Sequence, residues 1–350
     1  MFVYAGIDEA GYGPMFGPLV VGCSVFGVSQ PRSSHDDDDA EIDAEIDAEP
    51  ARTAPTPDLW RRLSAAVCRD IKGTRRGKLA VNDSKKLKTS SGNGLRHLEL
   101  GVLCFASLSG EMPPTVGAWL DSIGETSHRD LEAMPWYEAT HDRPWQKLPT
   151  SVTEGEVAIA RSMLAVAARA GGVELLDLDA AVVFEDRFNR MVAATRSKAA
   201  TSFTFVAGHL QSIWDRHGES GPWVVVDRQS GRTRYRALLA ELFPEALLTI
   251  LREDDTSSVY RLEQDRDGRR MTISFEVDAE PRHLPTALAS MASKYTRELM
   301  MHRFQSWFTA RAPDVRPTAG YALDARRFWQ AIRPHLPALD IEPDRLRRIS

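Results

Sequence analysis

Two adjacent carboxylates near the start of the sequence, Asp8 and Glu9, could together bind a ligand at one site. They follow the apolar run of residues 3–7 and precede a loop that contains Gly11 and Gly13. An apolar run bounded by glycine predicts a strand that leads into a turn, and glycine lets the backbone approach a ligand closely. Neighbouring side chains of a strand point to opposite faces, so both acids can meet only where the strand ends or twists. A solvated turn is the alternative for these residues taken alone.

A third acid ends a second apolar run. Residues 223–226 are Trp-Val-Val-Val, and Asp227 follows them directly. A continuous run of this kind predicts a strand that is buried on both faces. In open α/β sheets, functional groups gather at the carboxyl ends of strands, which gives Asp227 the same setting as Asp8. A strand followed by an aspartate is common, so the pattern alone leaves a structural role open.

The segments around these acids resemble the motifs of the type 2 ribonuclease H family, ribonucleases HII and HIII. Residues 8–18 (DEAGYGPMFGP) are similar to the first motif and residues 81–87 (VNDSKKL) to the second. Residues 290–298 (SMASKYTRE) resemble a helix with the family pattern SIIAKVTRD, and Gly320-Tyr321 is similar to a Gly-Tyr pair in the C-terminal segment. The motifs extend over most of the chain, but only a small part of its positions carries the residue that the family pattern has there.

The resemblance implies a ribonuclease H-like α/β fold, a mixed sheet flanked by helices, with a C-terminal helical segment. It implies an endonuclease that hydrolyses the RNA strand of RNA–DNA hybrids or RNA–DNA junctions by a two-metal-ion mechanism. Two Mg²⁺ or Mn²⁺ ions would be the cofactors, because hard cations prefer oxygen ligands. The implied catalytic and metal-binding carboxylates are Asp8, Glu9, Asp227 and Glu298. The implied substrate contacts are Gly11, Tyr12, Gly13, Ser84, Lys85, Lys86, Lys294 and Tyr321.

The chain departs from the family pattern at two of these positions. Tyr12 stands where ribonucleases HII have arginine, so a phosphate contact is lost and the choice between junctions and long hybrids stays open. Glu298 stands where the helix motif ends in aspartate, and the added methylene leaves the preference between Mg²⁺ and Mn²⁺ open. Two other functions therefore remain: a related nuclease with a changed preference, such as structured nucleic acid, and a non-catalytic protein that binds hybrids.

Two segments interrupt the family pattern. We expect a catalytic domain over residues 1–310 and a basic helical segment over residues 311–350. Residues 33–57 form an acidic low-complexity insertion that we expect to be disordered, either as a solvated loop or as an acidic mimic of nucleic acid. Residues 108–150 form an insertion rich in tryptophan, which either packs as a small local core or stacks on bases. The roles of both insertions stay open.

Composition and charge fit a protein that binds nucleic acid without a membrane anchor. The 350 residues carry a formal net charge of −5, and removing the nine acids of residues 36–49 leaves +4, so the remainder is mildly basic. The three cysteines are widely spaced, which favours a reducing, cytoplasmic location over a disulfide framework or a zinc site. We expect neither a membrane helix nor a secretory signal. No obligate protein partner is evident, and the oligomeric state stays open.

Overall fold

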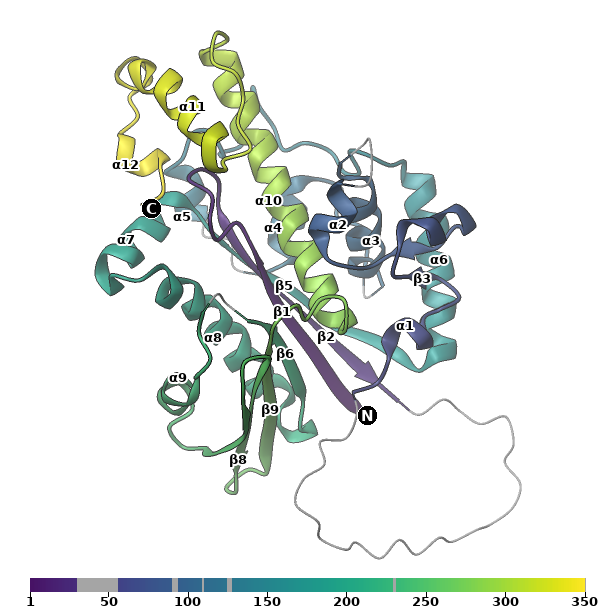
Figure 1. Cartoon of the computed structure of the whole chain (residues 1–350). Helices are drawn as coiled ribbons and strands as arrows, with labels where there is room; N and C mark the ends of the chain where they lie inside the picture. Colours follow the sequence, from purple (N-terminus) through teal and green to yellow (C-terminus); the bar gives the residue numbers. More distant parts are fainter. Residues whose placement is uncertain (30–55, 90–93, 109, 125–127, 229–230, 350) are drawn as a thin grey trace, which may run out of the picture.

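A seven-stranded mixed sheet forms the centre of the computed structural model, which describes residues 1–349 except 30–55, 90–93, 109, 125–127 and 229–230 (Figure 1). The spatial order of its strands is β5-β2-β1-β6-β9-β8-β7. Antiparallel pairs join β5, β2 and β1, parallel pairs join β1, β6 and β9, and antiparallel pairs join β9, β8 and β7. The strands are β1 (Phe2–Ala10), β2 (Leu19–Val28), β5 (Val173–Val183), β6 (Trp223–Asp227), β7 (Leu247–Glu253), β8 (Ser257–Gln264) and β9 (Arg269–Glu276).

Helices cover both faces of the sheet, because alternate residues of the central strand β1 are buried on opposite sides. Val3, Ala5 and Ile7 belong to one core cluster with residues of α7, α8 and α9, whereas Tyr4 belongs to a second cluster with residues of α3, α6 and α10. Their bounds are α3 (Arg96–Ala106), α6 (Glu154–Gly171), α7 (Glu185–Thr195), α8 (Lys198–His217), α9 (Arg236–Leu242) and α10 (Leu284–Arg311).

Smaller elements complete the described chain. A two-stranded parallel sheet joins β3 (Val67–Cys68) to β4 (Leu79–Ala80). The other α-helices are α1 (Leu59–Arg62), α2 (Ser84–Thr89), α4 (Val116–Ser122), α5 (His128–Glu132), α11 (Ala322–Ile332) and α12 (Pro343–Leu346). Short 3₁₀ helices are η1 (Ile71–Arg76), η2 (Gly218–Ser220), η3 (Arg333–His335) and η4 (Pro337–Leu339).

The expected fold class, a mixed sheet flanked by helices with a C-terminal helical segment, is confirmed by this arrangement. The domain boundaries stay a prediction. The expected disorder of residues 33–57 falls almost entirely outside the described residues. In the described part of the chain, no helix combines the length and apolarity that crossing a membrane requires.

The apolar run of residues 100–107 predicts a buried strand, and this prediction is wrong, because residues 96–106 form α3. A short continuous apolar run does not distinguish a buried strand from a helix that is buried over most of its surface. In the tryptophan-rich segment, Trp119 and Trp136 are buried and so are not exposed for stacking on bases, but they belong to the main hydrophobic core and not to a separate local core. The indole Nε1 of Trp119 donates to Thr296 Oγ1 of α10 at 3.0 Å, so this segment packs against the longest helix of the described chain.

Helix α10 lies against β1 and β2 at a distance that only glycine permits (Figure 1). A Cβ atom on Gly6 of β1 would stand 2.0 Å from the backbone nitrogen of Thr286, and one on Gly22 of β2 would stand 2.6 Å from the carbonyl oxygen of Ala289. Polar contacts complete the seam: Ser24 Oγ of β2 donates to Pro285 O at 2.8 Å. The helix is therefore held in one position relative to the strand that carries Asp8.

The first prediction concerns this seam. Replacing Gly6 by alanine should lower the free energy of unfolding by about 3 kcal/mol or more, because the added methyl group overlaps backbone atoms that cannot move aside. Gly208 is the matched control, since it lies exposed inside α8 and a Cβ atom added there would meet no heavy atom within 4 Å. Gly208→Ala should raise stability by roughly 0.5–1 kcal/mol through helix propensity. Chemical denaturation measures both, and equal effects would contradict the close contact.

Candidate metal site

A cavity of about 470 Å³ opens where β1 and β6 end. The two strands pair in parallel as far as Ile7 and Val226, so the residues that follow, Asp8 and Asp227, lie next to each other at the same edge of the sheet. Helix α10 closes one side of the cavity and the loop after β1 closes another. The lining residues are Asp8, Glu9, Ala10, Gly11, Tyr12, Gly13, Ser84, Lys85, Asp227, Glu280, Ser290, Lys294 and Tyr321.

Three carboxylates converge in this cavity. Asp8, Asp227 and Glu280 each offer an oxygen, and these oxygens lie within 4.8 Å of one another. Asp8 and Glu280 are buried, and Asp227 is half-buried. Three such groups cannot all carry a negative charge at this distance unless protons or a cation compensate for their repulsion. Carboxylate oxygens are the preferred ligands of hard divalent cations, so the group fits Mg²⁺ or Mn²⁺.

Burial and the repulsion between neighbouring carboxylates raise the pKa values of these three acids. Burial, followed by the charges of Asp227 and Glu280, raises the pKa of Asp8 well above its ordinary value. Burial also raises the pKa of Asp227. Burial, followed by the charge of Asp227, raises the pKa of Glu280 to about 7. Without a bound cation, each of the three carboxylates therefore keeps its proton to a higher pH than an exposed acid of the same type does.

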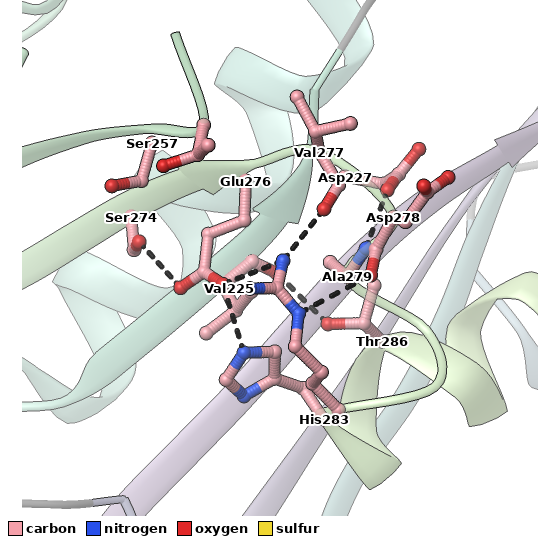
Figure 2. Close-up of polar contacts among 12 residues, drawn as sticks. Val225, Asp227, Ser257, Ser274, Glu276, Val277, Asp278, Ala279, His283 and Thr286 are labelled. Atoms are coloured by element: carbon pink, nitrogen blue, oxygen red, sulfur yellow. Dashed lines mark hydrogen bonds and ion pairs between the residues drawn. The ribbon is translucent and has the colours of Figure 1, made fainter. Parts of the chain in front are cut away.

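Hydrogen bonds fix the two acids that come from strands. The carboxylate oxygen Oδ1 of Asp227 accepts from the backbone N–H of Ala279 at 3.0 Å (Figure 2). The backbone carbonyl of Asp8 accepts from Ser293 Oγ of α10 at 3.2 Å. Ser290, one helical turn earlier, contacts Asp8 through its side chain and Ser84 Oγ at 3.1 Å. Asp8 is thus held by α10, and Asp227 by the turn between β9 and α10.

Glu280 belongs to that same turn, residues 277–283. Figure 2 shows that the side chain of Glu276, at the end of β9, forms polar contacts with this turn. Glu276 Oε2 accepts from His283 Nε2 and from the Arg282 guanidinium, each at 3.0 Å, and Oε1 accepts from Ser274 Oγ at 2.7 Å. Burial alone would raise the pKa of Glu276, but these donors outweigh it and lower the pKa to about 2. A permanently ionised Glu276 therefore fixes both ends of the turn that carries Glu280.

Glu9 and Glu298 take positions outside the group of three. Glu9 lines the cavity, and its Oε2 accepts a hydrogen bond from Ser202 Oγ of α8. Glu298 lies further along α10, where its Oε1 is 2.9 Å from Lys294 Nζ and 4.0 Å from an Arg297 guanidinium nitrogen. Among the described residues, Glu298 belongs neither to the three-carboxylate group nor to the cavity lining. Its assignment as a metal ligand stays a prediction.

Glu280 is absent from the site residues that the sequence predicts. The signal that could have found it is the position of β9, which is parallel to β6 and so ends at the same edge of the sheet as Asp8 and Asp227. Acids that follow such a strand are candidates for the same site. The sequence offers Asp278 and Glu280 there, and no motif distinguishes them.

Cationic and aromatic side chains stand around the acids. Lys85 lines the cavity at the start of α2, and its backbone N–H donates to Asp83 Oδ1 at 2.8 Å. Burial lowers the pKa of Lys85, but the neighbouring carboxylates, Asp83 first and then Asp8, outweigh burial and raise it overall. Lys86 is exposed and does not line the cavity in the described structure. Lys294 of α10 also lines the cavity, and its Nζ lies 5.6 Å from the ring centroid of Tyr321, which is 41% exposed.

The glycine loop has one tightly packed and one open position. Gly11 has φ +90°, and a Cβ atom there would stand 2.6 Å from the carbonyl oxygen of Pro18, so only glycine fits. Gly13 is exposed and lines the cavity, and a Cβ atom there would meet no protein atom within 4 Å. The structure therefore explains Gly11 by the fold, whereas Gly13 leaves space that a ligand can use.

Comparisons with known proteins find distant structural likenesses. No protein-family model and no curated protein matches the chain. Among solved structures, it resembles a chain of the PCNA:RNase HII complex from Archaeoglobus fulgidus, with 16% identity, a TM-score of 0.39, and coverage of 99% of this chain and 92% of that one. It also resembles ribonuclease H2 from Pyrococcus horikoshii OT3, with 13% identity, a TM-score of 0.38 and coverage of 99% and 92%.

A third similar structure is that of Bst-RNase HIII in complex with Mn²⁺, with 11% identity, a TM-score of 0.40, and coverage of 99% of this chain and 66% of that one. These three structures are of RNase HII, ribonuclease H2 and RNase HIII. Sequence identity and structural similarity this low do not determine an activity.

The second prediction follows from the raised pKa of Glu280. Between pH 4.5 and 7, folded Glu280 keeps a proton that its unfolded form releases, so stability without divalent cations should fall as the pH rises through this window. Thermal unfolding in a chelator should show this fall, and Glu280→Gln should reduce its slope. Adding Mn²⁺ at pH 7.5 should raise the melting temperature of the unaltered protein more than that of the variant. A pH profile identical in both proteins would contradict the proximity of the three acids.

Proposed function

We propose that this chain is a metal-dependent endonuclease that hydrolyses the RNA strand of RNA–DNA hybrids or RNA–DNA junctions. The observation that carries the proposal is the convergence of Asp8, Asp227 and Glu280 at the edge of the sheet, beside an open glycine loop and two lysines. Dense negative charge in a cavity that also presents cations suits a site where divalent ions and a polyanion are bound together. The motif resemblance supports the choice of a hybrid as substrate.

The ligands we propose for the metal ions are Asp8, Glu9, Asp227 and Glu280. This set differs from the sequence-based set by one residue, since Glu298 pairs with Lys294 and Glu280 lies with the other acids. Bound divalent cations would supply Lewis-acid stabilisation of the scissile phosphate and activate water. The donor set is made entirely of carboxylates, which suits Mg²⁺ and Mn²⁺ alike, and the preference between them stays open.

The remaining lining residues would bind and orient the substrate. Lys85 and Lys294 both line the cavity that holds the acids, where each can contact a phosphate of the bound strand. The exposed ring of Tyr321 offers a flat surface for a sugar or a base next to the cleaved position. The loop from Gly11 to Gly13 brings backbone N–H groups close to the strand. Selectivity for RNA then depends on contacts with the 2′-hydroxyl group, which DNA lacks.

The third prediction tests the carboxylates. Asp8→Asn, Asp227→Asn and Glu280→Gln should each reduce cleavage of a hybrid by about a thousandfold or more, because several kcal/mol of transition-state stabilisation depend on the metal site. Asp278→Asn is the matched control, since it removes the same charge from an exposed residue of the same turn, at a positive φ that asparagine tolerates. It should cleave at close to the wild-type rate. Near-normal cleavage by Asp8→Asn or Asp227→Asn would refute the site.

Substrates distinguish the proposal from its alternatives. A uniform RNA–DNA hybrid, a DNA duplex with one embedded ribonucleotide and a branched DNA should be compared in Mg²⁺ and in Mn²⁺. Cleavage of either ribose-containing substrate supports the proposed activity. Cleavage of the branched DNA alone indicates a nuclease with another preference. Binding of the hybrid without cleavage in either metal indicates a non-catalytic protein.

The fourth prediction uses the contrast within the glycine loop. Gly13→Ala should leave the melting temperature close to that of the wild type, because its methyl group meets no protein atom, yet it should weaken hybrid binding by about tenfold where the strand approaches the backbone. Gly11→Ala should instead destabilise the fold, since it combines a positive φ with steric overlap. Fluorescence anisotropy and thermal unfolding separate the two effects. Unchanged binding by Gly13→Ala would place the strand elsewhere.

A further inference from the structure

The loop between β1 and β2, residues 11–18, rests on three buried charged side chains from distant parts of the chain. Arg297 of α10 donates through a guanidinium nitrogen to the carbonyl of Phe16 at 2.9 Å. Glu185, at the beginning of α7, accepts from the N–H of Gly17 at 2.9 Å. Arg348, beyond α12, donates to the carbonyls of Gly11 and Tyr12, the latter at 3.0 Å. All three side chains are at most 1% exposed, so they act on the loop from the interior.

The position of Arg348 is fixed by its neighbours. Its backbone N–H donates to the carbonyl of Met15 at 2.9 Å, and its guanidinium carbon lies 3.8 Å from the ring centroid of Phe188 in α7. Asn189, the next residue of α7, accepts from the N–H of Ile349 at 2.8 Å and donates to the carbonyl of Arg347 at 2.8 Å. The segment around Arg348 is therefore fastened to α7 on one side and to the loop on the other.

Arg348 remains charged in this setting. Burial lowers its pKa to about 10, while the charge of Glu185 opposes the lowering. A buried guanidinium that is ionised at neutral pH needs acceptors, and the two loop carbonyls supply them. The planar fork of arginine reaches both carbonyls from one side chain, whereas a lysine ammonium presents a single point of charge.

The hydrogen bonds of Arg348 also orient the opposite side of the loop. In a planar trans peptide, the carbonyl of one residue and the N–H of the next point in opposite directions. Because the carbonyls of Gly11 and Tyr12 point inward to Arg348, the N–H groups of Tyr12 and Gly13 point outward. Both residues line the cavity beside Asp8 and Glu9. Neither N–H has a protein acceptor among the described residues. Two successive N–H groups facing one cavity form a site for an acceptor oxygen.

We propose that Arg348 is a positioning residue that holds the N–H groups of Tyr12 and Gly13 toward the cavity, where they bind an acceptor oxygen of the nucleic-acid strand. The identity of the ligand rests on the proposed function. The orientation of the loop does not depend on that function. Arg348 is too deeply buried to contact the strand itself. The C-terminal segment thereby contributes to recognition through the backbone of a loop near the opposite end of the chain.

The fifth prediction compares Arg348→Gln and Arg348→Lys with Arg347→Gln. The control removes the same charge from the adjacent residue, whose guanidinium lies over the ring of Trp329. Hydrogen exchange of the peptide covering residues 9–18 should become about tenfold faster or more in Arg348→Gln, less so in Arg348→Lys, and remain unchanged in Arg347→Gln. Where a substitution prevents folding, Arg348→Lys carries the comparison, since it keeps the buried charge.

Binding and kinetics supply the second measurement. KM for a hybrid should rise about tenfold or more in Arg348→Gln with a smaller change in kcat, because a contact with the bound strand is lost while the carboxylates are intact. Mn²⁺ affinity should stay within about twofold of the wild-type value. A larger loss for hybrid than for DNA binding would assign the N–H groups to the ribose hydroxyl, and equal losses would assign them to a phosphate.

The outcomes separate the two proposals. If the unaltered protein cleaves no hybrid, the proposed function fails, while hydrogen exchange still tests the orientation of the loop. If exchange in residues 9–18 is the same in Arg348→Gln as in the unaltered protein, the positioning role is overturned whatever the activity. The same conclusion follows if Arg347→Gln changes exchange and KM as much as Arg348→Gln does.

Discussion

The close contact of α10 with β1 and β2 is the constraint on which the rest of the structure depends. Glycines at positions 6 and 22 let the helix backbone lie directly on the sheet, and serines on both sides complete the contact. One rigid helix then serves three purposes at the cavity. The turn before it carries Glu280, its second turn faces Asp8 through Ser290, and Lys294 and Arg297 follow on the next turn. A small shift of α10 would displace all of these groups together.

The electrostatics of the cavity have two layers. In the outer layer, three carboxylates with raised pKa values share the cavity with two lysines, and a divalent cation would relieve the repulsion among the carboxylates. In the inner layer, buried arginines and Glu185 hold the glycine loop through backbone atoms. Under the proposed function, the outer charges bind ions and phosphates, whereas the inner charges bind backbone groups of the protein itself.

The sequence predicts the part of the site that depends on local patterns. Asp8 and Asp227 follow apolar runs, and such runs mark strands that end at one edge of a sheet. Glu280 follows β9 at the same edge, but knowing that β9 is parallel to β6 requires the strand order, which no local pattern contains. Glu298 is the reverse case, because a clear motif predicts it as a metal ligand, whereas its side chain pairs with Lys294 in this structure and the assignment stays a prediction. Arg348 has no local signal at all, since its hydrogen-bond partners lie more than 330 residues away.

The long sequence separation between the loop and Arg348 affects the order in which the two are synthesised. Gly11 and Arg348 are 337 residues apart, so the loop is translated long before the guanidinium that supports it. At about 5–20 residues per second, roughly half a minute passes between the two events. The other two buried supports, Glu185 and Arg297, are also translated after the loop but before Arg348. The loop therefore gains its supports one at a time, and the last of them comes only with residue 348.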